Sequence, residues 1–225
     1  MEQPFFLFLS TTKIKYLTPL FITGTGTDVG KTLVAAIITE ALQADYWKPV
    51  QAGYADSTDS LRIQQMISNK RTKIHPELYR LKMPASPHIA APAENKRITI
   101  KEIIAHLPQT KNQLIIEGAG GLMVPLNETE LVLTLIKKLR ARVIIVSKNE
   151  LGSINHSLLT AAVLKKEKIN VAGWIFTEEY KSYEEEIAQW SGYPVIARIK
   201  HLSLISKESV HAEAFEMRPL LKAIL

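Results

Sequence analysis

Residues 24–32 read Gly-Thr-Gly-Thr-Asp-Val-Gly-Lys-Thr, and this stretch is the most informative part of the chain. Apolar residues 20–23 precede it and the helix-like residues 33–38 follow it, so the order is strand, glycine-rich loop and helix. Backbone N–H groups of such a loop, with the positive end of the helix dipole, form a site for a polyphosphate. Lys31 adds charge for the outer phosphates, and the Thr32 hydroxyl is placed to coordinate a Mg²⁺ that the phosphates also hold.

The loop is one residue longer than the common phosphate-binding pattern. Five residues separate Gly24 from Gly30, where the usual pattern has four, and Thr25 stands in the usual glycine position. A glycine-rich turn that only joins strand to helix is one alternative. A dinucleotide fingerprint is another, but Val29 stands where its third glycine belongs. The Gly-Lys-Thr at the start of the helix favours phosphate binding.

Length and composition predict one folded domain. The chain has 225 residues, of which 46% are hydrophobic and 22% charged, and we find no repeat and no low-complexity segment. We expect residues 1–19 to be a loosely ordered extension and residues 20–225 to form a single domain. The apolar residues 5–9 are too few to span a bilayer, and the basic residues follow this run instead of preceding it as in a signal peptide.

Charge and cysteine content exclude several classes of protein. The formal net charge is +6, yet the basic runs 137–142 and 165–168 lie near predicted helix ends, where cations suit the helix dipole. We therefore expect no nucleic acid partner and no membrane partner. The chain has no cysteine, which excludes disulfides, thiolate metal sites and cysteine nucleophiles and fits a cytoplasmic location.

Buried strands alternate with helices along the rest of the chain. The apolar, β-branched runs lie at residues 114–116, 143–146, 171–176 and 195–197. Two helix starts resemble capping boxes, Thr99 with Glu102 and Ser182 with Glu185. This alternation predicts an α/β fold, a doubly wound and mostly parallel sheet with helices on both faces, in which ligands bind at the carboxyl ends of the strands.

Three segments follow predicted strands and should open onto one crevice. Lys48 follows residues 46–47, Glu117 follows residues 114–116, and residues 151–156 follow the strand at 143–146. Glu117 is either a metal-binding acid or an exposed acid where the strand ends and a glycine turn begins. Lys48 either reaches into the crevice or lies along the surface.

Asp59 and the histidines are less informative. Asp59 precedes an amphipathic segment, so it is either a metal ligand or the N-cap of a helix. The six histidines show no metal-binding spacing.

Six motifs in order resemble the dethiobiotin synthetase family, whose fold is of the P-loop nucleoside triphosphatase type. Besides residues 24–32, they are Lys-Pro-Val-Gln-Ala-Gly at 48–53, Ala-Ser-Pro-His at 85–88, Glu-Gly-Ala-Gly-Gly at 117–121, Leu-Gly-Ser-Ile-Asn-His at 151–156 and Gly-Trp-Ile at 173–175. The longer glycine loop is the form that this family uses. The resemblance implies a cyclo-ligase of biotin synthesis, which uses ATP and Mg²⁺ to close a ureido ring on 7,8-diaminopelargonic acid with CO₂.

The resemblance also implies roles for individual residues. Catalysis would rest on Lys31 and Lys48, and Mg²⁺ would be bound by Thr32, Asp59 and Glu117. The residues implied to bind the nucleotide are Asp28, Val29, Gly30, Lys31, Thr32, Leu33, Asp59, Glu117, Gly118, Ala119, Gly120 and Thr177. The residues implied to bind the substrate are Thr27, facing the carbamate, Ala52, and Leu151, Gly152, Ser153 and Asn155, which would receive its distal carboxylate across a homodimer interface.

Three positions depart from the family pattern. Thr177 stands where an asparagine commonly follows the Gly-Trp strand, and residues 197–200 read Ala-Arg-Ile-Lys where the family has a Gly-x-Ile-Pro turn. Asn149-Glu150 is also unusual before the carboxylate-binding turn. A threonine offers no paired donor and acceptor to a base edge, so we expect a weaker preference for ATP over other triphosphates.

Two other functions remain open at this point. One is a P-loop ATPase that acts as a switch or partitioning protein, a class that often has an additional lysine early in the loop, where this chain has Thr25 and Gly26. The other is a basic nucleotide- or RNA-binding protein without catalytic activity. The chain lacks the aromatic and basic platform of that class.

Overall fold

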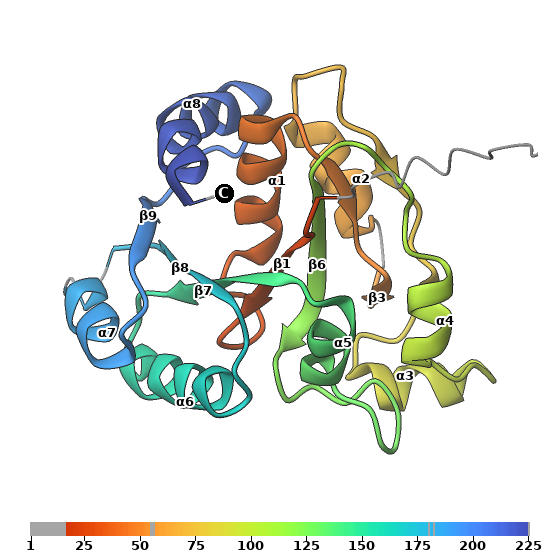
Figure 1. Cartoon of the computed structure of the whole chain (residues 1–225). Helices are drawn as coiled ribbons and strands as arrows, with labels where there is room; N and C mark the ends of the chain where they lie inside the picture. The colour runs from red at the N-terminus through yellow and green to blue at the C-terminus, as the bar shows by residue number, and fades with distance from the viewer. Residues whose placement is uncertain (1–16, 55–56, 180, 182, 225) are drawn as a thin grey trace, which may run out of the picture.

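The computed structural model describes residues 17–54, 57–179, 181 and 183–224. Its centre is a seven-stranded sheet in the order β4-β2-β6-β1-β7-β8-β9, in which every neighbouring pair is parallel (Figure 1). The strands are β1 Leu20–Gly24, β2 Asp45–Trp47, β4 Ile74–His75, β6 Leu114–Gly121, β7 Arg142–Lys148, β8 Val171–Thr177 and β9 Val195–Ile199.

Helices cover both faces of this sheet. They are α1 Lys31–Leu42, α2 Asp59–Met66, α3 Pro87–Ala93, α4 Ile100–Ala105, α5 Val132–Leu139, α6 Ser153–Lys166, α7 Glu184–Ser191 and α8 Lys207–Ile224. Figure 1 shows α1 and α8 on one face and α5, α6 and α7 on the other. The predicted doubly wound α/β fold is confirmed.

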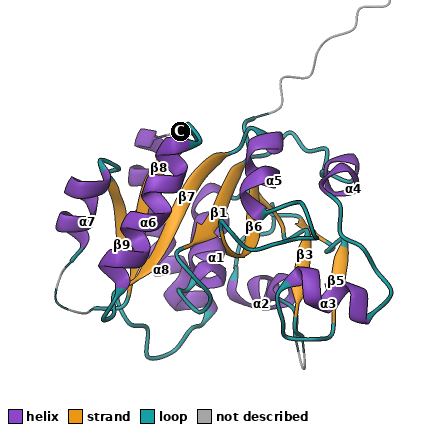
Figure 2. Ribbon diagram, turned by 90° about the horizontal axis from the view of Figure 1, so that it is seen from below, coloured by secondary structure: helices purple, strands orange, loops and turns teal. Residues whose placement is uncertain are grey.

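Alternation along β1 feeds two hydrophobic cores. Leu20 and Ile22 pack under α1 and α8, whereas Phe21 points to the opposite core, which includes residues of α4 and α5. Successive side chains of a strand point to opposite faces, so a central strand covered on both sides is apolar throughout. Strands β3 Val50–Ala52 and β5 Tyr79–Leu81 form a separate parallel pair beside α3 (Figure 2).

The strand β6 is longer than the sequence indicates. We expected it to end before Glu117 and to be followed by a glycine turn, but it continues to Gly121, and Glu117 lies within it opposite Ile22 of β1. Glycine is needed here because a Cβ at Gly118 would come within 2.7 Å of the Phe21 ring. The close approach of β1 therefore explains this glycine, and the predicted turn is wrong.

The helix starts give a mixed result. The Thr99 hydroxyl caps α4 by accepting a hydrogen bond from the Glu102 N–H at 3.2 Å, as predicted. The Glu102 carboxylate does not complete the box, because it accepts a hydrogen bond from the Tyr79 hydroxyl. The cap of α2 is Thr58 and not Asp59, so the helix-cap interpretation of Asp59 is wrong.

Some predictions fall where the structure gives no description. Ser182, proposed as the cap of the helix that begins at Glu184, lies outside the described residues, as do residues 1–16 of the predicted extension. The domain boundary at residue 20 therefore stays a prediction. Among the described residues, no helix combines the length and the apolar character needed to cross a membrane.

Candidate active site

The glycine-rich loop joins β1 to α1 with its backbone in unusual conformations. Asp28 and Gly30 both have positive φ, 54° and 85°. Gly30 precedes the first residue of α1, and no side chain of the described residues caps this helix. The N–H groups of the first helical turn have no partner within the helix, so they are available to phosphate oxygens.

Thr177 at the end of β8 supports the loop from outside. Its hydroxyl donates a hydrogen bond to the Val29 carbonyl at 3.0 Å, and a Cβ at Gly30 would lie 2.9 Å from its methyl group. The side chain is buried. In this arrangement the donor capacity of the Thr177 hydroxyl is used by the loop backbone.

Lys31 is folded back against the loop. Its ammonium donates a hydrogen bond to the Gly26 carbonyl at 2.7 Å. Burial lowers its pKa to about 8, against the opposing effect of the nearby Glu117 carboxylate. The amine therefore changes charge within the neutral to mildly alkaline range.

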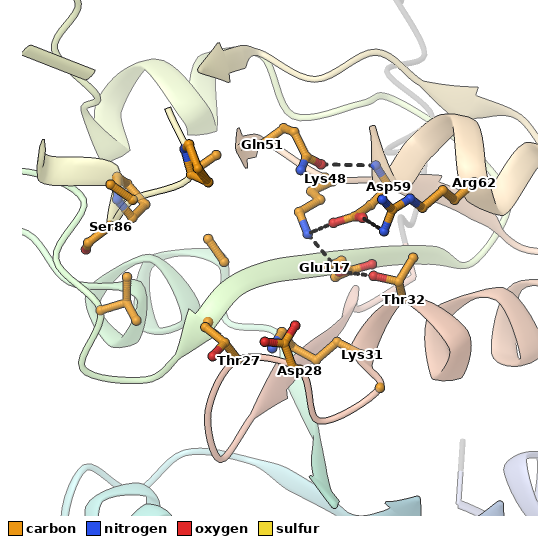
Figure 3. A pocket seen from close by; sticks show the side chains of 18 of the residues that line it. Thr27, Asp28, Lys31, Thr32, Lys48, Gln51, Asp59, Arg62, Ser86 and Glu117 are labelled. Carbon is orange, nitrogen blue, oxygen red and sulfur yellow. Dashed lines mark hydrogen bonds and ion pairs between the residues drawn. The ribbon is translucent and has the colours of Figure 1, made fainter. Parts of the chain in front are cut away.

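Lys48, Asp59 and Glu117 form a charge cluster beside the loop, in which Lys48 and Glu117 are buried and Asp59 is partly exposed (Figure 3). The Lys48 ammonium contacts an oxygen of Asp59 and lies 2.8 Å from Glu117 Oε1. Burial favours the neutral amine, but the two carboxylates outweigh this effect and raise the pKa of Lys48 above its ordinary value. Lys48 is therefore a permanent cation in the interior, held between the two acids.

Both oxygens of Glu117 are hydrogen-bonded. Thr32 Oγ1 donates to Oε1 at 3.0 Å, on the same oxygen that Lys48 contacts. The Tyr46 hydroxyl donates to Oε2 at 2.8 Å, and burial, with the Glu117 charge, raises the pKa of this tyrosine well above its usual value. Glu117 is 1% exposed, so the alternative that it is an exposed acid at the end of a strand is wrong.

The donor set suits a magnesium ion. The described residues contain no group of three or more acidic, histidine or cysteine side chains placed for a metal. Mg²⁺ needs no such group, since it uses one or two carboxylates with substrate phosphates and several waters. The Thr32 hydroxyl and the Glu117 and Asp59 carboxylates supply hard oxygen ligands of this kind, and the Lys48 ammonium, which contacts both acids, already shows that the cluster accommodates a cation.

A cavity of about 730 Å³ joins the loop to this cluster. Twelve of the predicted site residues line it. They are Thr27, Asp28, Gly30, Lys31, Thr32, Leu33, Lys48, Ala52, Asp59, Glu117, Ala119 and Gly120. Of the remaining predictions, Val29, Gly118 and Thr177 lie behind the loop and the strands, outside the lining of this cavity.

The structure adds lining residues that the sequence analysis did not single out. Gln51 accepts a hydrogen bond from the Asp59 N–H at 3.1 Å and donates one to the Gly53 carbonyl. Arg62, one helical turn after Asp59, lies 3.8 Å from its carboxylate, and Ser86 lines the far wall. Gln51 and Ser86 belong to the motifs at 48–53 and 85–88, so membership of these motifs could have identified them as site residues.

The segment 151–155 lies elsewhere, at the start of α6. Leu151 is 83% exposed, and the Ser153 side chain is buried with no hydrogen-bond partner for its hydroxyl among the described residues. The next residue, His156, lines a second cavity of about 490 Å³, to which Leu159 and Met123 also contribute. Thr27 and Gly120 line both cavities, so the two are adjacent.

Comparisons with known proteins agree with this geometry. Residues 18–209 match a family described as an AAA domain. The chain is similar to the ATP-dependent dethiobiotin synthetase BioD of Cytophaga hutchinsonii, at 49% identity over 88% of this chain and 95% of that protein. It is also similar to the enzyme of the same name from Christiangramia forsetii, at 44% identity over 88% and 96%.

Solved structures share the fold at much lower identity. The septum site-determining protein MinD from Pyrococcus horikoshii, complexed with Mg-ADP, aligns over 90% of each chain with a TM-score of 0.55 and 17% identity. Such identity carries information about the fold alone. Because the higher identities extend over nearly the whole length of the curated relatives, the chain belongs to the dethiobiotin synthetase family.

Proposed function

We propose that this protein is an ATP-dependent cyclo-ligase that converts 7,8-diaminopelargonic acid, CO₂ and ATP into dethiobiotin, ADP and phosphate. The observation that carries the proposal is the single cavity in which Lys31 and Lys48 lie with Thr32, Asp59 and Glu117. A phosphate loop alone serves many reactions. A second buried lysine beside the acid pair supports a reaction in which a second anion meets the terminal phosphate.

ATP would bind with its phosphates on the loop backbone and the start of α1. Residues 28–33 and 117–120 would line the nucleotide. Mg²⁺ would be held by Thr32, Asp59 and Glu117, and when bound it supplies charge neutralisation for the phosphate oxygens. Lys31 would release the Gly26 carbonyl and turn to these oxygens, since phosphate is the stronger acceptor.

The first chemical step needs a neutral substrate amine. An alkylamine has a pKa near 10.4, so deprotonating it at pH 7 costs roughly 4–5 kcal/mol. The Lys31 and Lys48 ammonium groups reduce this cost, because like charges disfavour the protonated amine. The neutral amine adds to CO₂ and releases one proton to solvent, which gives a carbamate that the same cations and Thr27 stabilise.

The carbamate oxygen then attacks the γ-phosphoryl group in line, and ADP leaves. Charge spreads over the transferring oxygens, where Lys31 and Lys48 lie. The second amine of the substrate, in its neutral form, attacks the carbonyl carbon of the mixed carbamic–phosphoric anhydride. Phosphate leaves with the proton that the amine loses, and the urea ring closes. No covalent bond to the protein is formed.

The distal carboxylate of the substrate would bind at the start of α6, at Leu151, Gly152, Ser153 and Asn155, across a homodimer interface, while Ala52 contacts the chain of the substrate. The Ser153 hydroxyl, which lacks a partner in the described part of the chain, and the exposed Met123 and Leu159 support this assignment. Sedimentation velocity tests the dimer. A cytoplasmic location is part of the same proposal, since ATP and bicarbonate are at hand there.

A switch or partitioning ATPase on the same fold is the competing function, and the relatives do not favour it. Incubation with diaminopelargonic acid, bicarbonate, Mg²⁺ and each triphosphate, followed by mass detection of the cyclic urea, separates the two. We expect dethiobiotin to form in step with ADP. Hydrolysis of ATP at the same rate with and without the diamine, and no cyclic urea, would overturn the proposed function.

A further inference from the structure

Tyr46 is a fully buried residue of β2 whose hydroxyl donates a hydrogen bond to the Glu117 carboxylate. In the parallel pair of β2 and β6, Tyr46 lies opposite Ile115, so Glu117 stands two residues farther along and on the same face of the sheet. This is the face that α1 covers, and α1 carries Thr32. The register of two strands therefore brings the tyrosine, the acid and the helix together.

The two oxygens of Glu117 have different partners. Oε1 accepts hydrogen bonds from Thr32 and Lys48, which line the cavity. Oε2 accepts one from the Tyr46 hydroxyl at 2.8 Å, on the side of the hydrophobic core. Tyr46 itself does not line the cavity. A carboxylate held at both oxygens cannot rotate about its last bond, so Oε1 stays turned toward the cavity.

We propose that Tyr46 is a positioning residue, which holds the Glu117 carboxylate in the orientation that binds the divalent cation. The inference rests on the proposed role of Glu117 as a metal ligand. It assigns to a residue of the core an effect on metal affinity, without contact to metal, nucleotide or substrate. Loss of a partner of this kind weakens metal binding by about 10- to 100-fold in other sites.

The alternative is a tyrosine that contributes only to stability. The chain offers a matched control, because Tyr79 of β5 is also buried and donates its hydroxyl to a carboxylate, that of Glu102 on α4, away from the cavity. Tyr46→Phe and Tyr79→Phe each remove one hydroxyl from one tyrosine–glutamate pair. A purely structural role predicts similar behaviour of the two variants toward metal.

The experiment measures Mn²⁺ binding by electron paramagnetic resonance on the folded protein with a non-hydrolysable ATP analogue, together with thermal unfolding and analogue affinity in EDTA. We expect Tyr46→Phe to weaken Mn²⁺ binding about 10-fold or more, and Tyr79→Phe to leave it unchanged. Both variants should keep the metal-free analogue affinity of the wild type. If Tyr46→Phe does not fold, Tyr46→Met, which fills similar volume without a donor, is measured instead.

Equal Mn²⁺ affinity of folded Tyr46→Phe and the wild type would overturn the inference, and so would an equal loss in both variants. Because Mn²⁺ binding requires no turnover, the result is independent of the ligation assay. A wild-type protein that binds Mn²⁺ with the analogue but forms no dethiobiotin would refute the proposed function and leave the Tyr46 comparison valid.

Discussion

The phosphate-loop cavity and the start of α6 differ in how their polar side chains are paired. Around the phosphate loop, Lys31, Thr32, Lys48 and Glu117 all have hydrogen-bond partners within the chain. At the start of α6, the buried Ser153 hydroxyl has none among the described residues. A buried polar group without a partner costs about 1–3 kcal/mol, so the second region gains more from a ligand or a second subunit than the first. We infer that one chain assembles the phosphate-loop cavity, whereas the start of α6, the proposed carboxylate site, is completed on binding.

The largest expected effect tests whether the reaction takes place in the phosphate-loop cavity, whose polar side chains are paired. Lys48→Ala should lower turnover by about 10²–10³ and leave ADP affinity nearly unchanged, because Lys48 acts on charge that develops during the reaction. Steady-state kinetics and ADP titration measure the two quantities. Lys137→Ala is the control, since Lys137 also forms an ion pair, with Glu167, but on the surface. Unchanged turnover would remove Lys48 from the mechanism.

A second test uses the charge of Lys31. Because its pKa is about 8 in the free protein and bound phosphates favour the ammonium, ADP affinity should fall about tenfold per pH unit as the pH rises above 8. Titrations in EDTA between pH 7 and 9.5 measure this. Lys31→Arg should flatten the profile, since arginine stays charged. If the affinity of the wild-type protein for ADP did not change over this pH range, the pKa of about 8 for Lys31 would be contradicted.

The start of α6 is tested at Ser153. Ser153→Ala should raise the KM for diaminopelargonic acid about tenfold, as expected for one lost hydrogen bond to a charged group, with little change in kcat and no loss of stability. The matched control is Ser157→Ala on the same helix, because the Ser157 hydroxyl is already paired with Ser147 at 2.9 Å. That variant should lose stability and keep its KM. A higher KM in Ser157→Ala, with an unchanged KM in Ser153→Ala, would show that the two regions do not differ as described.

The smallest expected effect concerns the base. With the Thr177 hydroxyl bound to the Val29 carbonyl, we expect ATP to be preferred over GTP, CTP and UTP by less than about tenfold, since one lost polar contact is worth about 1 kcal/mol. A nucleotide panel at fixed diamine and bicarbonate measures the ratios of kcat/KM. Strict use of ATP would show that groups other than Thr177 recognise adenine.

Local patterns explain which parts of the structure could be predicted. The glycine loop, the Thr99 cap and the apolar strands are recognisable because each depends on residues close together in the sequence. Such patterns do not separate Thr58 from Asp59, because both residue types are good helix caps. Only the backbone conformation decides, since Thr58 is extended and Asp59 is the first residue of the helix.

Sequence patterns predicted the longer strands of the sheet, the phosphate loop and the set of lysines and acids beside it, but not the short strands β3, β4 and β5. The contacts among these residues depend on tertiary packing, which places Lys48 between two carboxylates, Tyr46 on the second oxygen of Glu117, and Thr177 on the loop backbone. These partners are 11, 69, 71 and 148 residues apart. Their contacts follow from strand order and register, which are set when the two hydrophobic cores pack on opposite faces of one sheet, and no local sequence pattern contains that information.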